Sequence, residues 1–109
     1  GLVGAEFSRI YFNILDNDML NAIRFHTTGR KNMTLLEKIV FISDKIEPGR
    51  KYNGIDKLRD LVYSDIDITI IEYINNVIRY NQNNNIITHK QTLKCLKQLI
   101  KNREDLDGN

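Results

Sequence analysis

Three side chains in the first half of the sequence could do chemistry together: His26, Asp44 and Arg50. Histidine changes charge near neutral pH and ligates metals. Asp44 stands among mostly apolar residues, where a carboxylate is costly to bury unless it is paired, hydrogen-bonded or bound to metal. Arg50 carries a guanidinium, which can donate two parallel hydrogen bonds to a phosphate. With the hydroxyl of Thr27 beside His26, the set suits a phosphorylated substrate and a divalent metal.

Each of these residues also has a purely structural interpretation. Asp44 is explained as well by an ion pair with Lys45 or with an arginine elsewhere, and His26 by a hydrogen bond from a helix end to the backbone. One His and one Asp are too few for a catalytic metal, which needs at least three protein ligands. His89 lies in a late loop, where exposure to solvent is the simplest expectation.

Helices must position these groups. Apolar residues at helical spacing predict a lead-in helix over residues 3–14, and Asp16-Asn17-Asp18 is expected to end it and cap a second helix over 19–26. Gly29 is expected to be left-handed past that helix. Thr34 and Glu37 form a capping box that opens a helix reaching about Glu47, before Pro48-Gly49. Its inward stripe is predicted to be Leu35, Ile39, Ile42 and Ile46, widened by Leu36 and Val40. Phe41 lies on the far side, so the helix is expected to be buried over most of its circumference.

The rest of the chain is also predicted to be helical. A short helix is expected over 55–63, with Arg59 on its wet side, and a longer helix over 67–81. After a turn, Thr88 is expected to cap a last helix in which Cys95 packs among leucines. The fold class is therefore all-α, without an internal repeat or linker.

Composition excludes several function classes. The chain has 109 residues and a net charge of +2, from sixteen basic and fourteen acidic residues, which is too even to indicate a nucleic-acid polymer as partner. A single cysteine, Cys95, excludes an intrachain disulfide, and no apolar run approaches a membrane span. We therefore expect a cytoplasmic protein that does not bind membranes.

Longer motifs carry a resemblance to a known family. HTTGR, MTLLEKI, the Asp of SDKIEPGR, the following YNGIDKLR and the late IITHKQT are similar to motifs of the YqeK family of HD-domain phosphohydrolases. The resemblance implies an HD-domain-like helical bundle around a divalent metal, commonly iron, with Mn and Mg as alternatives. It implies symmetrical hydrolysis of diadenosine tetraphosphate to two ADP, and a homodimer is allowed.

The resemblance also assigns residues to the site. It implies that Asp44 and His26 belong to the metal and catalytic centre and that both lie close to substrate. It implies that Thr27 contacts the nucleotide phosphates and that Arg50 neutralises phosphate charge. The residues that would line the nucleotide are Ile87, Thr88, His89, Lys90, Gln91 and Thr92.

The family's early His and its His-Asp pair would come before Gly1. We therefore expect residues 1–109 to be the C-terminal part of one HD-type domain, without its N-terminal helices and inactive alone. Half a bundle would leave apolar surface of the helix at 34–47 exposed. The alternatives are a hydrolase or phosphodiesterase acting on another nucleotide, and a non-catalytic helical module of a larger, NAD-biosynthesis-type fusion protein.

Overall fold

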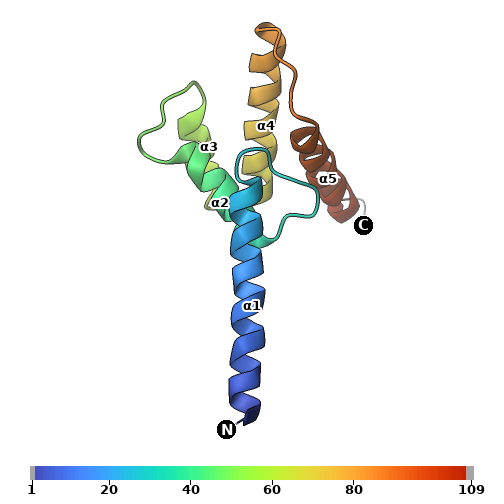
Figure 1. Cartoon of the computed structure of the whole chain (residues 1–109). Coiled ribbons are helices and arrows are strands. Elements are labelled where there is room, and N and C mark those ends of the chain that lie inside the picture. Colours follow the sequence, from blue (N-terminus) through green and yellow to red (C-terminus); the bar gives the residue numbers. More distant parts are fainter. Residues whose placement is uncertain (1, 108–109) are drawn as a thin grey trace.

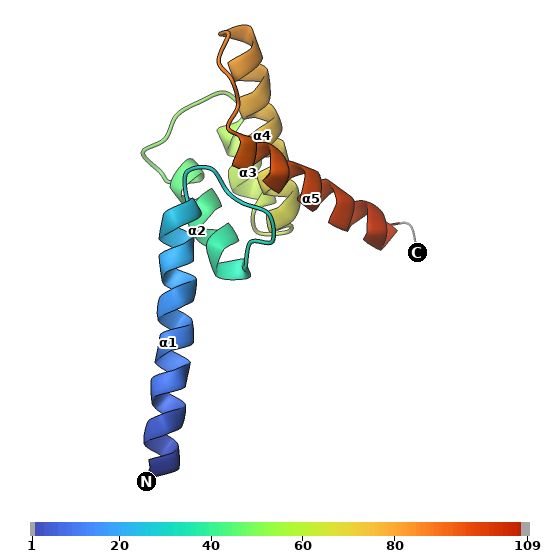
Figure 2. The ribbon, with the colours of Figure 1, turned by 45° about the vertical axis from the view of Figure 1, so that its right-hand side comes forward.

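A computed structural model describes residues 2–107, with the side chains of residues 6, 10, 13 and 16–106. Within that range the chain forms five helices and no strand, which confirms the all-α prediction. Helix α4 contacts α2, α3 and α5, whereas α1 contacts α2. The N-terminal part of α1 projects away from the other helices in both views (Figures 1 and 2). None of the helices within residues 2–107 has the length and apolarity needed to cross a membrane.

Helix α1 runs without interruption over Leu2–Phe25, so the predicted break at Asp16-Asn17-Asp18 is wrong. An Asp or Asn inside a helix costs only about 0.7 kcal/mol relative to Ala, which is too little to end one by itself. Asp18 has a different role, because its Oδ1 accepts a 2.6 Å hydrogen bond from the hydroxyl of Thr34. Of the apolar residues whose spacing predicted the helix over 3–14, the side chain of Ile10 is described and is 50% exposed. Those of Val3, Phe7, Tyr11 and Ile14 lie outside the described side chains.

Helix α2 (Leu35–Ile46) begins where the capping box predicted. The Glu37 N–H donates to the Thr34 hydroxyl at 3.2 Å, and the Thr34 N–H donates to the Glu37 carboxylate at 3.0 Å. Both bonds use groups that the first turn of a helix would otherwise leave unpaired. The helix ends at Ile46, just before Pro48-Gly49, as expected.

The buried face of α2 differs from the predicted stripe. Leu35 and Ile39 are 64% and 44% exposed, whereas Phe41, expected on the far side, is 1% exposed. Two charged residues, Glu37 and Lys45, are buried on the same face as Phe41, one turn before and one turn after it. The predicted stripe is therefore right at Ile42, which is 1% exposed, and at Ile46, which packs against the core, and wrong at Leu35 and Ile39. The predicted exposure of apolar surface on this helix is confirmed at Leu35 and Ile39.

The last three helices lie close to their predicted ranges. Helix α3 covers Ile55–Leu61, α4 covers Ile66–Asn83 and α5 covers Lys90–Asp107. The cap predicted for Thr88 is wrong, because its hydroxyl instead accepts from the Asn81 amide at 3.0 Å. His89 takes that place, and its Nδ1 accepts from the Gln91 N–H at 3.0 Å.

The core lies where α2, α4 and α5 meet. Its buried members from α2 and α4 pack against Cys95 of α5, which is 1% exposed, as its predicted packing role requires. They are Met33, Phe41, Ile42, Ile70, Ile74, Cys95, Leu96 and Leu99. In contrast, Met19, Leu20 and Ile23 of α1 are 47%, 62% and 58% exposed. The core therefore holds α2 in place, and these three described apolar side chains of α1 face solvent.

Candidate functional site

The site is built on the turn between α1 and α2. Gly29 is left-handed, with φ +71°, and its N–H donates to the Phe25 carbonyl at 2.8 Å, as predicted for the residue past a helix end. A Cβ at this position would lie 3.1 Å from the Cys95 sulfur. Both the backbone angle and the close approach of α5 therefore require glycine here.

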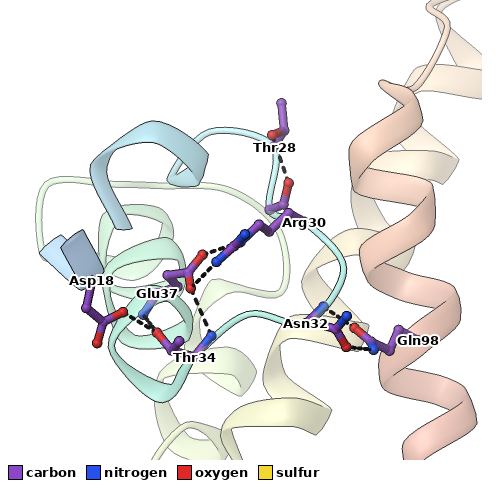
Figure 3. Close-up of polar contacts among 8 residues, drawn as sticks. Asp18, Thr28, Arg30, Asn32, Thr34, Glu37 and Gln98 are labelled. Atoms are coloured by element: carbon purple, nitrogen blue, oxygen red, sulfur yellow. Dashed lines mark hydrogen bonds and ion pairs between the residues drawn. The ribbon is translucent and has the colours of Figure 1, made fainter. Parts of the chain in front are cut away.

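Arg30 and Glu37 attach this turn to α2 (Figure 3). The guanidinium donates two hydrogen bonds to the carboxylate, Nε to Oε1 at 2.6 Å and Nη2 to Oε2 at 2.8 Å. Arg30 also lies 4.7 Å from the centre of the Phe25 ring. Burial alone would raise the pKa of Glu37, but the bonds from Arg30 and Thr34 outweigh it and hold that pKa below its usual value. Arg30 is therefore a structural cation and is not free for phosphate.

His26 follows the last residue of α1 and is oriented by backbone. Its Nδ1 lies 2.5 Å from the Ile23 carbonyl oxygen, which can only accept, so Nδ1 carries the proton. In the uncharged form of the ring the lone pair is on Nε2, which lies 3.4 Å from the Thr27 hydroxyl. The predicted backbone bond is thus present, and it leaves Nε2 able to bind a ligand.

Lys45 brings the two predicted residues of the site together. Its ammonium, on a side chain 9% exposed, donates to the His26 carbonyl at 2.7 Å and to Asp44 Oδ2 at 3.1 Å. It also lies 4.6 Å from the centre of the Phe41 ring. Burial lowers the pKa of Lys45. The pKa of Asp44 is held below its usual value, first by the hydrogen bond from Lys45 and then by the charges of Lys45, Arg50 and His26.

Arg50 also faces the Asp44 carboxylate. Its Nη2 lies 3.6 Å from Oδ2, and half of the Arg50 side chain is exposed to solvent. Both predicted interpretations of Asp44 as an ion-paired residue therefore apply at once, with Lys45 and with Arg50. An anion that approached from solvent would meet the guanidinium of Arg50 directly.

Arg59 binds the segment that carries Arg50. Its predicted place on the solvent-exposed side of α3 is wrong. Its guanidinium donates to three carbonyls at the end of α2 and beyond it: Ile46 at 3.0 Å, Glu47 at 2.8 Å and Arg50 at 3.0 Å. Such carbonyls have no partner within a helix. Tyr52 adds a hydroxyl bond to the Lys45 carbonyl at 2.7 Å. Sequence spacing gave no signal for either contact, since both residues join the helix end from outside it.

We expect Arg59→Ala to lower the free energy of unfolding by about 1–2 kcal/mol, since three hydrogen bonds from a charged group are lost and the Ile46 and Arg50 carbonyls lose the partner that Arg59 provides. Urea denaturation of the chain measures this. Arg79→Ala, on the exposed side of α4, is the control and should change the value by less than about 0.5 kcal/mol. Equal effects of the two substitutions would contradict the role given to Arg59.

The predicted nucleotide residues at 87–92 lie in the α4–α5 connection and the start of α5. Ile87 is 94% exposed, and His89 and Lys90 are exposed as well. Thr92 is buried, and its hydroxyl donates to the Thr28 carbonyl at 2.7 Å. The side chains of Asn32 and Gln98 make a second link between the α1–α2 turn and α5 (Figure 3). Of the predicted set, Thr92 is thus the residue bonded to the turn that carries His26.

The donors present supply part of a metal site. His26 Nε2 and Asp44 Oδ1 are ligand types that divalent metals accept. Residues 2–107 contain no group of three or more His, Cys, Asp or Glu side chains that could hold an ion. Lys45 and Arg50 already place positive charge on Asp44 Oδ2. The described residues therefore do not complete a metal site by themselves.

Comparison with known proteins places this geometry in context. No family model matches the chain. The chain is 43% identical over 97 residues to a symmetrical bis(5'-nucleosyl)-tetraphosphatase of Halalkalibacterium halodurans, which covers 89% of this chain and 52% of that protein. The corresponding Staphylococcus aureus protein is 39% identical over 98 residues, or 88% of this chain and 50% of that protein. The chain therefore spans about half the length of these curated relatives.

A solved structure supports the same likeness. It is a predicted HD superfamily hydrolase involved in NAD metabolism from Clostridium acetobutylicum, with a TM-score of 0.76 and 42% identity. The match covers 78% of this chain and 45% of that one. The resemblance carried by the HTTGR, MTLLEKI and SDKIEPGR motifs and the HD-type helical fold are confirmed.

Proposed function

We propose that this chain forms part of the active site of a metal-dependent enzyme that cleaves diadenosine tetraphosphate to two ADP. Its similarity to symmetrical bis(5'-nucleosyl)-tetraphosphatases and the fold that it shares with an HD superfamily hydrolase support the proposal. One observation carries the proposal. Lys45 holds the His26 turn and the Asp44 carboxylate together, with Arg50 beside them on the solvent side.

Each residue has a role that its contacts support. His26, oriented through Nδ1, offers Nε2, and Asp44 offers Oδ1 to a divalent metal, with iron first and Mn or Mg as alternatives. When bound, such a metal supplies an activated water for attack on phosphorus. Arg50 neutralises charge on the phosphate oxygens, Thr27 offers a hydroxyl to them, and residues 87–92 contact a nucleotide.

We propose further that residues 1–109 are the C-terminal part of one HD-type domain and that the remaining ligands come from residues outside this range. Two findings support this. The chain spans about half of its relatives, and two metal donors within the described residues fall short of the usual three. A cytoplasmic location is part of the proposal, since the one cysteine of the chain offers no intrachain disulfide.

The chain alone and a chimera test this proposal. In the chimera, residues 1–109 replace the matching segment of the Halalkalibacterium halodurans relative. With diadenosine tetraphosphate and Fe²⁺ or Mn²⁺, we expect steady ADP release from the chimera and at least about 100-fold less from the chain alone. Loss of a residue that only orients a metal ligand already lowers activity by up to about 100-fold, and loss of the metal ligands themselves should lower it at least as much. A chain alone that matched the chimera would refute the need for further residues. An inactive but folded chimera would refute the proposed function.

A further inference from the structure

A cleft opens next to Arg50, between the segment that follows α2 and the outer half of α4. Its volume is about 520 Å³, within the range of about 300–1,000 Å³ that is typical of small-molecule sites. Lys45 and Arg50 form one wall, and these are the two cations that contact Asp44. The cleft is therefore continuous with the candidate site.

Three tyrosines give the cleft an aromatic lining. Tyr52 and Tyr73 are half-buried, with ring centres 6.4 Å apart and planes inclined at 59°. Tyr80, two turns after Tyr73 on the same face of α4, is 62% exposed. Aromatic side chains of this kind stack on nucleobases, because every base presents a flat π-face.

The polar groups of the cleft match a nucleotide as well. The described lining residues include three cations, Lys45, Arg50 and Arg79, and no acidic side chain. Arg79 donates to the Asn76 side-chain oxygen on α4. Lys45 and Arg50 at one end would suit phosphates, and the tyrosines along the wall would suit a base.

We propose, on the basis of the proposed function, that this cleft binds one nucleoside 5'-diphosphate half of the dinucleoside tetraphosphate. The base stacks on Tyr80 and Tyr73, and the phosphates extend past Arg50 toward Asp44. A substrate that is cut at its centre has two such halves on either side of the reacting phosphorus. The cleft offers a site for one of these halves.

The contacts of the chain separate the two sites. Residues 87–92 reach the His26 turn through the bond from Thr92 to the Thr28 carbonyl. The cleft reaches the same turn through Lys45, which lines the cleft and donates to the His26 carbonyl. None of the residues that line the cleft belongs to 87–92. The cleft and residues 87–92 are thus two different sets of residues, and each is bonded to the turn that carries His26.

Equilibrium titration of the 109-residue chain with ADP tests the cleft directly, followed by amide chemical shifts. We expect shifts in residues 76–80 and at Tyr52, and a dissociation constant that Tyr80→Ala raises roughly 5- to 10-fold, the lower end for one stacked base. Tyr63→Ala is the matched control, because Tyr63 is 93% exposed and lies outside the cleft. Shifts confined to residues 26–29 and 87–92, or an unchanged constant for Tyr80→Ala, would overturn the proposal.

The chimera separates this inference from the proposed function. If it hydrolyses diadenosine tetraphosphate, Tyr80→Ala should raise KM roughly 5- to 10-fold and leave kcat within about twofold, since a stacked base contributes binding in both ground and transition states. Hydrolysis with an unchanged KM would refute the cleft and keep the function. ADP shifts in the cleft without any hydrolysis would refute the function and keep the cleft as a nucleotide site.

Discussion

Glu37→Ala is expected to lower the free energy of unfolding by about 3 kcal/mol, the largest effect on stability among the charged residues described here. The substitution removes a 1% exposed carboxylate that bonds Arg30 twice and accepts from the Thr34 N–H. Arg30 would remain partly buried without its counter-charge, and α2 would lose half of its capping box. Urea denaturation of the 109-residue chain measures the change.

Two further substitutions resolve the causes. Glu37→Gln retains a side chain that suits the capping box but removes the charge, so it should cost less than Glu37→Ala. Glu72→Ala is the control, because Glu72 forms only a partly exposed pair with Lys57 at 3.6 Å and should contribute less than about 1 kcal/mol. A Glu37→Ala variant as stable as the Glu72→Ala variant would show that the Arg30 pair does not hold the His26 turn.

Asp44→Asn is expected to have the largest effect on activity. In the chimera, we expect kcat to fall at least about 100-fold, since the neutral amide is a poorer metal ligand and leaves Lys45 and Arg50 without their shared carboxylate. The free energy of unfolding should fall by about 1–3 kcal/mol, because Lys45, whose side chain is 9% exposed, loses its carboxylate partner and keeps the bond to the His26 carbonyl. Product formation and urea denaturation on the same preparation separate the two effects.

Asp60→Asn is the matched control for that experiment. Asp60 is an exposed aspartate of α3, so its replacement should leave kcat within about twofold. An Asp44→Asn chimera that kept more than half of its activity would remove Asp44 from the candidate site.

Local signals predicted the helices well where short-range chemistry determines them. Thr34 and Glu37 lie three residues apart and satisfy each other's backbone partners, so the start of α2 could be predicted from four residues. Gly29 was predicted for the same reason, since a left-handed residue past a helix end favours glycine. In contrast, Asp16-Asn17-Asp18 offered cap residues in a segment that continues as helix.

The parts that sequence could not predict depend on contacts between distant residues. The buried face of α2 includes Glu37 and Lys45. Glu37 is tolerated there because Arg30 donates to its carboxylate, and Lys45 because its ammonium donates to the His26 carbonyl. Arg59 gave no local sign of its bonds to the end of α2, 9–13 residues away. Sequence could not show which residue brings His26 and Asp44 together, and in the structure Lys45 bonds to both.

Chromatography of the products released from diadenosine tetraphosphate by the chimera tests the central claim most directly. The account predicts ADP as the sole nucleotide product, two per substrate, because the cut falls at the centre of the phosphate chain between two nucleotide sites. ATP and AMP in equal amounts would show an asymmetric cut and would contradict it.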